Sequence, residues 1–595
     1  MNAYKVLHTR ISSFLLKAGI ASILCAFSLQ PVQQVQAQQR SLKLVSPATD
    51  QSEVTASTIY LRGLTDPAGF LLLNDQPIKV YSTGVFAAPL PLKMGQNTFV
   101  LRHGTGQDTL TRTLHINRVA PEKPQPTTGF AIERISILPG GDDIWLRAGD
   151  LLTVEIKATP GMKATFLKDI PMTEVAAQEA GVAGIYRGEY LVKDSDESIH
   201  EPLQFMLRDV QNNRVITKKS EQTVRLLTDQ HTYVGVSNKQ RVPLSYGLGA
   251  DRLGGAKMGF IDERVRMEIT GKMQGMYRVR LSGQDQVFIN QNDLDLLPGV
   301  QFRPHSLTGS WSVTSDGEQD YVSIGLSQRL PYVSVMEENP ARIVVDIYGA
   351  VSNSNWITQR QGLVAIKNVW YEQVSQDQFR AIIELQENEH WGYQISYRGN
   401  SLSIRVKPRP ASLNLSQLTI AVDAGHGGSN RGAVGLTGVL EKDLNLSMAK
   451  KLEALLIKKG ATVIMTRSDD RYTTNTQRLQ TLEEADPDIL ISIHCNAAGN
   501  PMVGGASTYY RHQAFRPITQ YIYDEMLKLD LGDFGNVGGF NFTLNSPTAY
   551  PSVLVEVAFM SNPADEERLL DPDFHDDMAE SILIGLENFL KSRSE

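Results

Sequence analysis

The chain has 595 residues, which at roughly 100–200 residues per domain is enough for three to five domains. Its net charge of -7 supplies no basic field to hold a polyanion, so no nucleic acid is expected as a partner. With only two cysteines, Cys25 and Cys495, a disulfide framework is excluded for any exported form that loses its first segment.

The first segment has the pattern of a signal peptide. Lys5, Arg10 and Lys17 come before or at the start of an apolar stretch from Ala18 to Leu29, and Val35-Gln36-Ala37 fits a small-x-small cleavage site. We therefore predict a signal peptide over residues 1–37 and export to the periplasm or cell envelope. The stretch is shorter than the about 20 residues that span a bilayer, so no integral membrane segment is expected in the mature chain. A retained signal anchor is the alternative.

Strand-rich modules are expected next. Over residues 38–120, alternating runs such as Thr58-Ile59-Tyr60-Leu61 are separated by turn formers such as Asp66-Pro67-Ala68-Gly69. This pattern is typical of an all-β sandwich and resembles the small Ig-like modules of bacterial surface proteins. The Pro-rich segment from Pro121 to Thr128 predicts an extended linker, and a second β module is expected over residues 129–230.

Two further β modules are predicted before the last third of the chain. Residues 231–300 contain candidate strands such as Tyr277-Arg278-Val279-Arg280-Leu281 and resemble bacterial SH3-like modules. Residues 305–408 contain apolar runs such as Ala341 to Tyr348 and resemble AMIN-type β domains. The expected architecture is thus multidomain, with N-terminal all-β modules followed by a different C-terminal domain.

Residues 416–592 alternate strands with amphipathic helices, which predicts an α/β domain with a mainly parallel sheet. The expected strands are Leu418 to Ala424, Ala461 to Arg467, Asp488 to His494, Ala506 to Arg511 and Ser552 to Val557. Apolar stripes at helical spacing are Leu444, Met448, Leu452, Leu455 and Leu456 after Glu441, and Met578, Ile582, Leu586 and Phe589 in the last helix. We expect these stripes to be core.

Polar side chains at strand and helix ends mark the candidate site. In such sheets ligands bind at the carboxyl ends of strands, where His426, His494 and Glu556 are expected. Glu441 begins a helix after a Gly-rich loop. Two imidazoles and a carboxylate are the ligand set of a catalytic zinc site, and a second carboxylate nearby can act as the base.

Other interpretations of these residues stay open at this point. A histidine at a strand end is by itself more often structural, although burying several charges without a metal would be costly. Gly425, Gly427 and Gly428 allow a tight turn around His426, and a phosphate-cradling loop is the rival interpretation of that turn. The Walker lysine pattern and a full dinucleotide fingerprint are absent from the sequence, which disfavours that rival.

A series of motifs resembles the zinc-dependent N-acetylmuramoyl-L-alanine amidases over Leu418 to Leu590. They are Asp423-Ala424-Gly425-His426-Gly427-Gly428, Glu441-Lys442-Asp443-Leu444-Asn445-Leu446, Thr466-Arg467 with Asp470, Ser492-Ile493-His494-Cys495-Asn496-Ala497, and Leu554-Val555-Glu556-Val557-Ala558-Phe559-Met560-Ser561-Asn562. The resemblance implies that His426, Glu441 and His494 ligate Zn²⁺ and that Glu556 is the catalytic residue. It implies cleavage of the amide between N-acetylmuramic acid and L-alanine of the peptidoglycan stem peptide.

The sequence departs from the family pattern at several positions. An Arg usual before the last catalytic strand is replaced around Asn545, and the loop Ser546-Pro547-Thr548-Ala549-Tyr550 is slightly longer than usual. Cys495 stands where Ala is common, and strand alternation points it away from His494, so we assign it to packing. We expect His512 to be a surface histidine rather than a ligand.

The resemblance implies a role in cell-wall remodelling, with separation of daughter cells as the family's common task. The β modules are expected to bind wall components, and envelope or divisome proteins are candidate partners. Some family members carry a helix that plugs the zinc site, but about sixty residues separate His494 from Glu556 here, so we hypothesise a site without such a plug. The competing hypotheses are a non-catalytic wall-binding protein with a degenerate amidase domain and a zinc peptidase acting on stem peptides.

Overall fold

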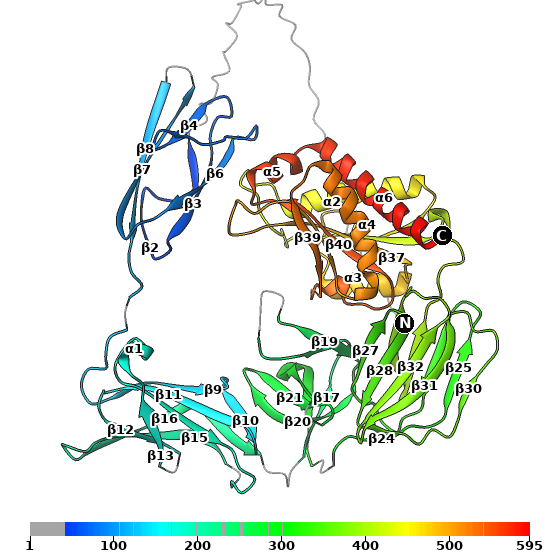
Figure 1. The fold of residues 1–595 in the computed structure, drawn as a ribbon, viewed down its shortest axis with the longest axis horizontal. Coiled ribbons are helices and arrows are strands. Elements are labelled where there is room, and N and C mark those ends of the chain that lie inside the picture. Colours follow the sequence, from blue (N-terminus) through cyan, green and yellow to red (C-terminus); the bar gives the residue numbers. More distant parts are fainter. Residues whose placement is uncertain are drawn as a thin grey trace, which may run out of the picture. The chain divides into compact units, whose positions relative to one another are not determined.

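The computed structural model describes residues 42–105, 108–122, 124–167, 169–197, 199–227, 232–249, 254–283, 285–299, 302–539 and 541–594. The predicted signal peptide, residues 1–37, lies outside them. Figure 1 shows strands throughout the N-terminal part of the described chain and helices gathered in the C-terminal part. The prediction of strand-rich N-terminal modules followed by an α/β domain is confirmed at this level.

The first strand-rich region contains β1 to β8. Its strands are Lys43–Ser46, Gln51–Val54, Thr58–Leu64, Phe70–Leu73, Gln76–Pro77, Val85–Pro91, Gly95–Thr105 and Asp108–Arg118. They form two sheets, with the strand orders β1-β3-β6 and β2-β8-β7-β4-β5. Successive side chains point to opposite faces of a strand, so Leu61, Phe86, Leu101 and Leu114 can share one buried cluster.

The next region contains β9 to β16 and the short helix α1 (Ala177–Ala180). Its strands are Ile132–Leu138, Asp143–Arg147, Leu151–Ala158, Lys163–Phe166, Ile170–Glu174, Ile185–Leu191, His200–Asp209 and Arg214–Leu227. Its core is a separate apolar cluster in which the rings of Phe166 and Phe205 stack with their centroids 6.2 Å apart. Strand β10 pairs with β16 and also contacts β20 of the following region.

Strands β17 to β23 follow. They are Tyr233–Ser237, Val242–Ser245, Lys257–Ile261, Arg266–Met273, Met276–Arg280, Gln286–Asn290 and Leu294–Leu297. The hairpin between β20 and β21 turns at Gln274 and Gly275, with φ of 50° and 72°. Positive φ at both central residues is the geometry of a type I′ turn, which suits the right-handed twist of the strands it joins.

Strands β24 to β34 form the last all-β region. They are Ser306–Leu307, Trp311–Ser315, Asp320–Ile324, Tyr332–Glu337, Arg342–Tyr348, Ala350–Val351, Ile357–Gln359, Ile366–Ser375, Gln378–Leu385, Tyr393–Arg398 and Ser401–Val406. The two larger sheets have the orders β30-β25-β26-β34-β33 and β27-β28-β32-β31. Between them Trp311 meets Phe379 edge to face, with ring centroids 5.7 Å apart. The buried carboxylate of Asp320 accepts hydrogen bonds from the backbone amides of residues 364–366.

The C-terminal domain is built on a sheet with the order β36-β35-β37-β40-β38-β39. These strands are β35 Thr419–Ala424, β36 Thr462–Met465, β37 Ile489–Asn496, β38 Ala506–Tyr510, β39 Asp533–Gly538 and β40 Ser552–Phe559. Neighbouring strands run parallel except for β38 and β40, which run antiparallel. The sheet is therefore mixed, and the carboxyl ends of β35, β37 and β40 meet at one edge.

Helices cover both faces of this sheet. They are α2 Glu441–Lys458, α3 Asn475–Ala485, α4 Arg516–Met526, α5 Pro563–Leu569 and α6 Pro572–Ser594. Helix α6 contacts both α2 and α4, and Figure 1 shows it as the long red helix. Most of the predicted apolar stripes are buried here, including Met448, Leu452, Ile582 and Leu586. Leu482 of α3 instead packs with Leu490 in a separate cluster on the other side of the sheet.

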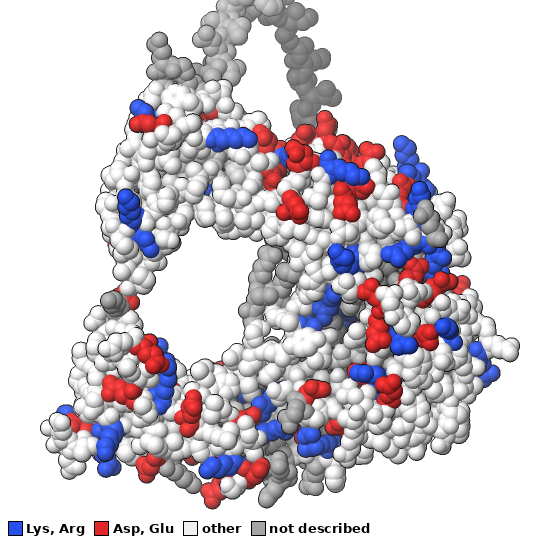
Figure 2. All heavy atoms as spheres, viewed as in Figure 1, with Lys and Arg blue, Asp and Glu red and all other residues white. Residues whose placement is uncertain are grey.

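The strands expected from sequence are present, and β39 is an additional strand that was not predicted. The 61 residues between His494 and Glu556 therefore hold two strands, β38 and β39, together with α4. Among the described residues no helix is both long and apolar enough to cross a membrane. On the face shown in Figure 2, basic and acidic side chains are interspersed with uncharged surface.

Candidate metal centre

His426 stands on the turn that follows β35. Its backbone has φ of 62°, in the left-handed region, and the next two residues, Gly427 and Gly428, also have positive φ. The turn brings the imidazole back over the sheet edge, with its side chain 25% exposed. His426 Nδ1 lies 3.0 Å from Asn430 Oδ1, which leaves Nε2 to face the other candidate ligands.

Glu441 is the first residue of α2 and is buried. Its Oε2 accepts a hydrogen bond of 2.7 Å from the amide of Ala433, and its Oε1 accepts one of 3.2 Å from Asn445, one turn along the helix. An anionic side chain at a helix N-terminus is favoured by the helix dipole. The loop before α2 and the helix itself therefore hold this carboxylate in one orientation.

His494 lies near the end of β37 and completes a group of three. The Nε2 of His426 and the Nδ1 of His494 each lie 3.1 Å from Oε1 of Glu441. One ligand atom from each of the three residues lies within 4.8 Å of the others. Residues far apart in the sequence thus converge as the carboxyl ends of parallel strands predict.

The protonation of this group follows from its contacts. Burial opposes ionisation of Glu441, but the hydrogen bonds with His426 and His494 outweigh it and lower the pKa of its carboxyl. Burial opposes protonation of His494, while its hydrogen bond with Glu441 and the nearby charge of Glu556 act the other way and raise its pKa. The cluster therefore consists of the ionised carboxylate of Glu441 between two imidazoles.

Glu556 lies on β40 directly opposite His494 on β37. Partners on adjacent strands place their side chains on the same face of the sheet, so the carboxylate of Glu556 belongs to the same edge. Glu556 is 6% exposed. The fourth residue singled out from sequence is thus brought beside the other three.

Further side chains hold these residues in place, and their roles were not predicted from the sequence. Asn430 lies four residues after His426, and Asn445 lies four residues after Glu441, one turn along the same helix. The second spacing is a signal that the sequence did contain, because residues i and i+4 are neighbours on a helix surface. Arg467 stood in one of the quoted motifs without an assigned role, and Arg478 was not singled out; both are buried and donate hydrogen bonds to the turn that carries His426.

Two other residues singled out from sequence lie outside the cluster. Cys495 is buried in the apolar core, as expected for a packing residue, and burial raises the pKa of its thiol. His512 is half-buried rather than a surface residue, and burial lowers its pKa to about 4. Its Nε2 lies 3.1 Å from the carbonyl of Ser546, so its role is to support the loop of residues 546–550.

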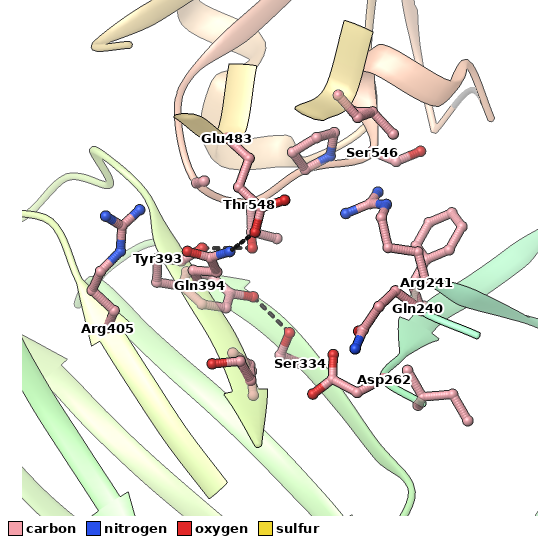
Figure 3. Close-up of a pocket in the computed structure, with 18 of the residues that line it drawn as sticks. Gln240, Arg241, Asp262, Ser334, Tyr393, Gln394, Arg405, Glu483, Ser546 and Thr548 are labelled. Atoms are coloured by element: carbon pink, nitrogen blue, oxygen red, sulfur yellow. Dashed lines mark hydrogen bonds between the residues drawn. The ribbon is translucent and has the colours of Figure 1, made fainter. Parts of the chain in front are cut away.

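The positions that depart from the family pattern also lie elsewhere. Asn545 is fully buried and donates a hydrogen bond of 2.8 Å to the carbonyl of Tyr509 on β38. The following loop lines a pocket of about 520 Å³, in which Figure 3 shows Thr548 and Glu483 near Gln394. None of the residues of the His/Glu/His cluster lines this pocket. Its lining therefore forms no part of the candidate metal centre.

Comparisons with known proteins give the family of two parts of the chain. Residues 420–588 match the family model of N-acetylmuramoyl-L-alanine amidase (Amidase_3), and residues 311–406 match that of the AMIN domain. The uncharacterized protein YqiI of Bacillus subtilis (strain 168) is 31% identical over 176 residues, which cover 29% of this chain and 84% of the relative. The probable cell wall amidase LytH of Staphylococcus aureus is 33% identical over 176 residues, 29% of this chain and 59% of the relative.

A solved structure is also similar to part of the chain. The catalytic domain of CwlV, an N-acetylmuramoyl-L-alanine amidase from Bacillus (Paenibacillus) polymyxa var. colistinus, is 34% identical and matches with a TM-score of 0.28. The match covers 29% of this chain and 98% of that one. On the family match and the similarity to YqiI, the chain belongs, through residues 420–588, to the N-acetylmuramoyl-L-alanine amidase family.

Proposed function

We propose that the chain is a zinc-dependent amidase that hydrolyses the bond between the lactyl group of N-acetylmuramic acid and L-alanine of the stem peptide. Its family membership supports the reaction class. The observation that carries the zinc dependence is the convergence of His426, Glu441 and His494, whose ligand atoms lie within 4.8 Å of one another. We assign these three residues as the metal ligands.

The donor set fits zinc. Two imidazole nitrogens and one carboxylate oxygen are ligands that suit Zn²⁺, and three protein ligands leave a fourth position for water. Outer partners that fix the ligands are also present, since Asn430 contacts the far nitrogen of His426 and Ala433 donates to the far oxygen of Glu441. A bound zinc ion would lower the pKa of a water molecule to about 7 and polarise the substrate carbonyl.

We assign Glu556 as the general base. Its place opposite His494 puts a carboxylate beside the proposed ligands without making it one of the three. A carboxylate there can take the proton of the attacking water and pass it to the amine of L-alanine as the amide bond breaks. The same residue thus serves both halves of the hydrolysis.

The test is zinc content and muropeptide release for the intact protein and for Glu556→Gln, with products identified by mass. We expect stem peptides that begin at L-alanine from the intact protein, and their loss in the variant while zinc is retained. Zinc without cleavage of several different cell walls would favour the non-catalytic wall-binding protein. Cleavage within the stem peptide would identify a peptidase.

The wider role is proposed on the same basis. The AMIN match favours binding to peptidoglycan, and a wall substrate requires a location outside the cytoplasm. We propose export by the signal peptide of residues 1–37, β modules over residues 38–120, 129–230, 231–300 and 305–408, and a catalytic domain over 416–592. Cell-wall remodelling and the separation of daughter cells are the proposed task, with envelope or divisome proteins as candidate partners of the β modules.

A further inference from the structure

Two arginine side chains donate hydrogen bonds to the backbone of the turn that carries His426. Arg467, two residues after the end of β36, donates from Nε to the carbonyl of Ala424 at 2.7 Å and from Nη2 to the carbonyl of Gly425 at 2.9 Å. Arg478, on α3, donates from Nη1 to the carbonyl of Ala424 at 2.8 Å and from Nη2 to the carbonyl of His426 itself. Three successive carbonyls of the turn therefore accept hydrogen bonds from guanidinium groups.

These hydrogen bonds act on a strained part of the backbone. His426 has φ of 62°, a conformation that residues with a Cβ adopt only when the surrounding structure imposes it. The direction of the imidazole depends on that conformation, because Cβ leaves the backbone at this residue. A hydrogen bond to the carbonyl of His426 acts on the peptide plane that follows it, so Arg478 bears directly on its ψ angle.

The guanidinium of Arg478 is itself fixed by charge. Its side chain is 3% exposed, and the carboxylate of Asp423, which is 1% exposed, accepts a hydrogen bond from its Nη1. The same carboxylate accepts hydrogen bonds from Ser492, at 2.6 Å, and from Thr466. The ion pair and these hydrogen bonds fix the orientation of the buried guanidinium. The planar guanidinium also reaches acceptors in directions that a lysine ammonium on its flexible side chain does not.

Helix α3 brings Arg478 to this place from another part of the chain. The helix starts with a capping box, in which the side chain of Thr474 accepts from the amide of Gln477 and the side chain of Gln477 accepts from the amide of Thr474. Arg478 lies in the first turn of this capped helix, and its Nε donates to the carbonyl of Thr473. The start of α3 and the turn after β35 are thus joined through one side chain.

We propose that Arg478 is a positioning residue for the metal centre, acting through the carbonyl of His426 and never touching the metal or the substrate. The inference rests on the proposed function, because it takes His426 as a ligand. A residue that served stability alone would change unfolding and leave the geometry of a bound metal as it was. A positioning residue changes that geometry in protein that remains folded.

The experiment replaces the bound metal with cobalt(II) and compares the intact chain with Arg478→Lys. The readouts are the visible absorption spectrum of bound cobalt and the zinc affinity, measured by competition with a chromophoric chelator, both without substrate. We expect a changed cobalt spectrum and zinc binding weakened about 10- to 100-fold, the range for loss of an outer partner of a metal ligand. An unchanged spectrum and affinity would overturn the inference.

A matched control separates positioning from stability. Arg278 is another buried arginine, which donates two hydrogen bonds to Asp150 far from the metal centre in the sequence. We expect Arg278→Lys to change unfolding and to leave the cobalt spectrum and zinc affinity unchanged. An equal loss of zinc affinity in this control would count against a specific role for Arg478.

A second variant covers the case in which Arg478→Lys does not fold. Thr466→Ala removes a hydroxyl that contacts both Arg478, at 3.2 Å, and Asp423. We expect a smaller shift of both readouts in the same direction, and no shift would overturn the inference. Failure of the intact chain to bind either metal would instead refute the proposed zinc centre, so the two failures are distinguishable.

Discussion

Gly425 lies directly against the imidazole of His494. A Cβ placed on Gly425 would come within 2.3 Å of His494 Cε1 and 2.5 Å of its Nε2. Such approaches are far inside van der Waals contact, and the whole ring is in the way rather than the end of a flexible chain. Gly425, which precedes the candidate ligand His426, thus leaves the room that the imidazole of His494 occupies.

Gly425→Ala is expected to lower kcat/KM on peptidoglycan by about 100-fold or more, because displacement of a ligand by about 1 Å has effects of that size. Zinc content should fall with it. The control is Gly499→Ala, since nothing lies within 4 Å of a Cβ at Gly499. Full activity of Gly425→Ala would show that His494 can move without cost.

Removal of the metal is expected to abolish activity and lower the midpoint of thermal unfolding. A ligand present at 1,000 times its Kd stabilises the folded state by about 4.1 kcal/mol, and this stabilisation is lost with it. Treatment with 1,10-phenanthroline followed by added Zn²⁺ tests this by activity and calorimetry. The non-chelating 1,7-isomer is the control, and restoration should fail in Glu441→Ala.

Glu566 is expected to make folding pH-dependent. Its buried Oε1 accepts hydrogen bonds from the amide and hydroxyl of Thr437, at 2.9 and 2.8 Å, and burial raises the pKa of its carboxyl. A carboxyl whose pKa is higher in the folded state binds more protons there. Its contribution to stability is therefore full below the pKa of an unfolded Glu, about 4.3, and falls as the pH rises through the pKa of the folded state.

The comparison of intact protein with Glu566→Gln tests this sign. An amide oxygen can still accept both hydrogen bonds. The free energy of unfolding of the variant should therefore increase relative to that of the intact protein as the pH rises through the raised pKa of Glu566. Glu566→Ala should instead lower the free energy of unfolding by about 1–3 kcal/mol, because it leaves the donors of Thr437 without this acceptor. The exposed Glu580 of α6, changed to Gln, is the control and should show no such trend.

Cys495 is expected to be inert in the folded protein. It is 3% exposed, and burial raises the pKa of its thiol, whereas the thiolate is the reactive form. In a Cys25→Ser background, a thiol reagent such as DTNB should find no reactive group until the chain is unfolded, and one thereafter. Rapid reaction of the native protein would contradict the assignment of Cys495 to packing.

The protein is expected to be active without an added activator. Between His494 and Glu556 the helix α4 packs against α6 and β38, so it is part of the domain's layers. Purified full-length protein should therefore release stem peptides from isolated cell walls with no other protein present. Strict dependence on an added partner would refute the hypothesis of a site without a plug.

Much of the C-terminal domain could be predicted because its signals are local. The alternation of apolar strands with stripes such as Met448 and Leu452 follows from burial on one face, and the expected strands are found with small shifts at their ends. The missed strand β39, Asp533–Gly538, is an edge strand with two glycines and little buried surface, so it carries neither signal.

The sequence by itself determined which side chains are candidates for the chemistry, because His426, Glu441, His494 and Glu556 stand in or next to recognisable strands and at the start of a helix. It could not show that Glu441 binds both imidazoles, or that Arg478 on α3 holds the carbonyl of His426. Those contacts join residues 15 to 53 positions apart, and their geometry depends on how helices pack on the sheet. Only the tertiary structure decided them, because distances of about 3 Å between such residues arise from packing and not from local preference.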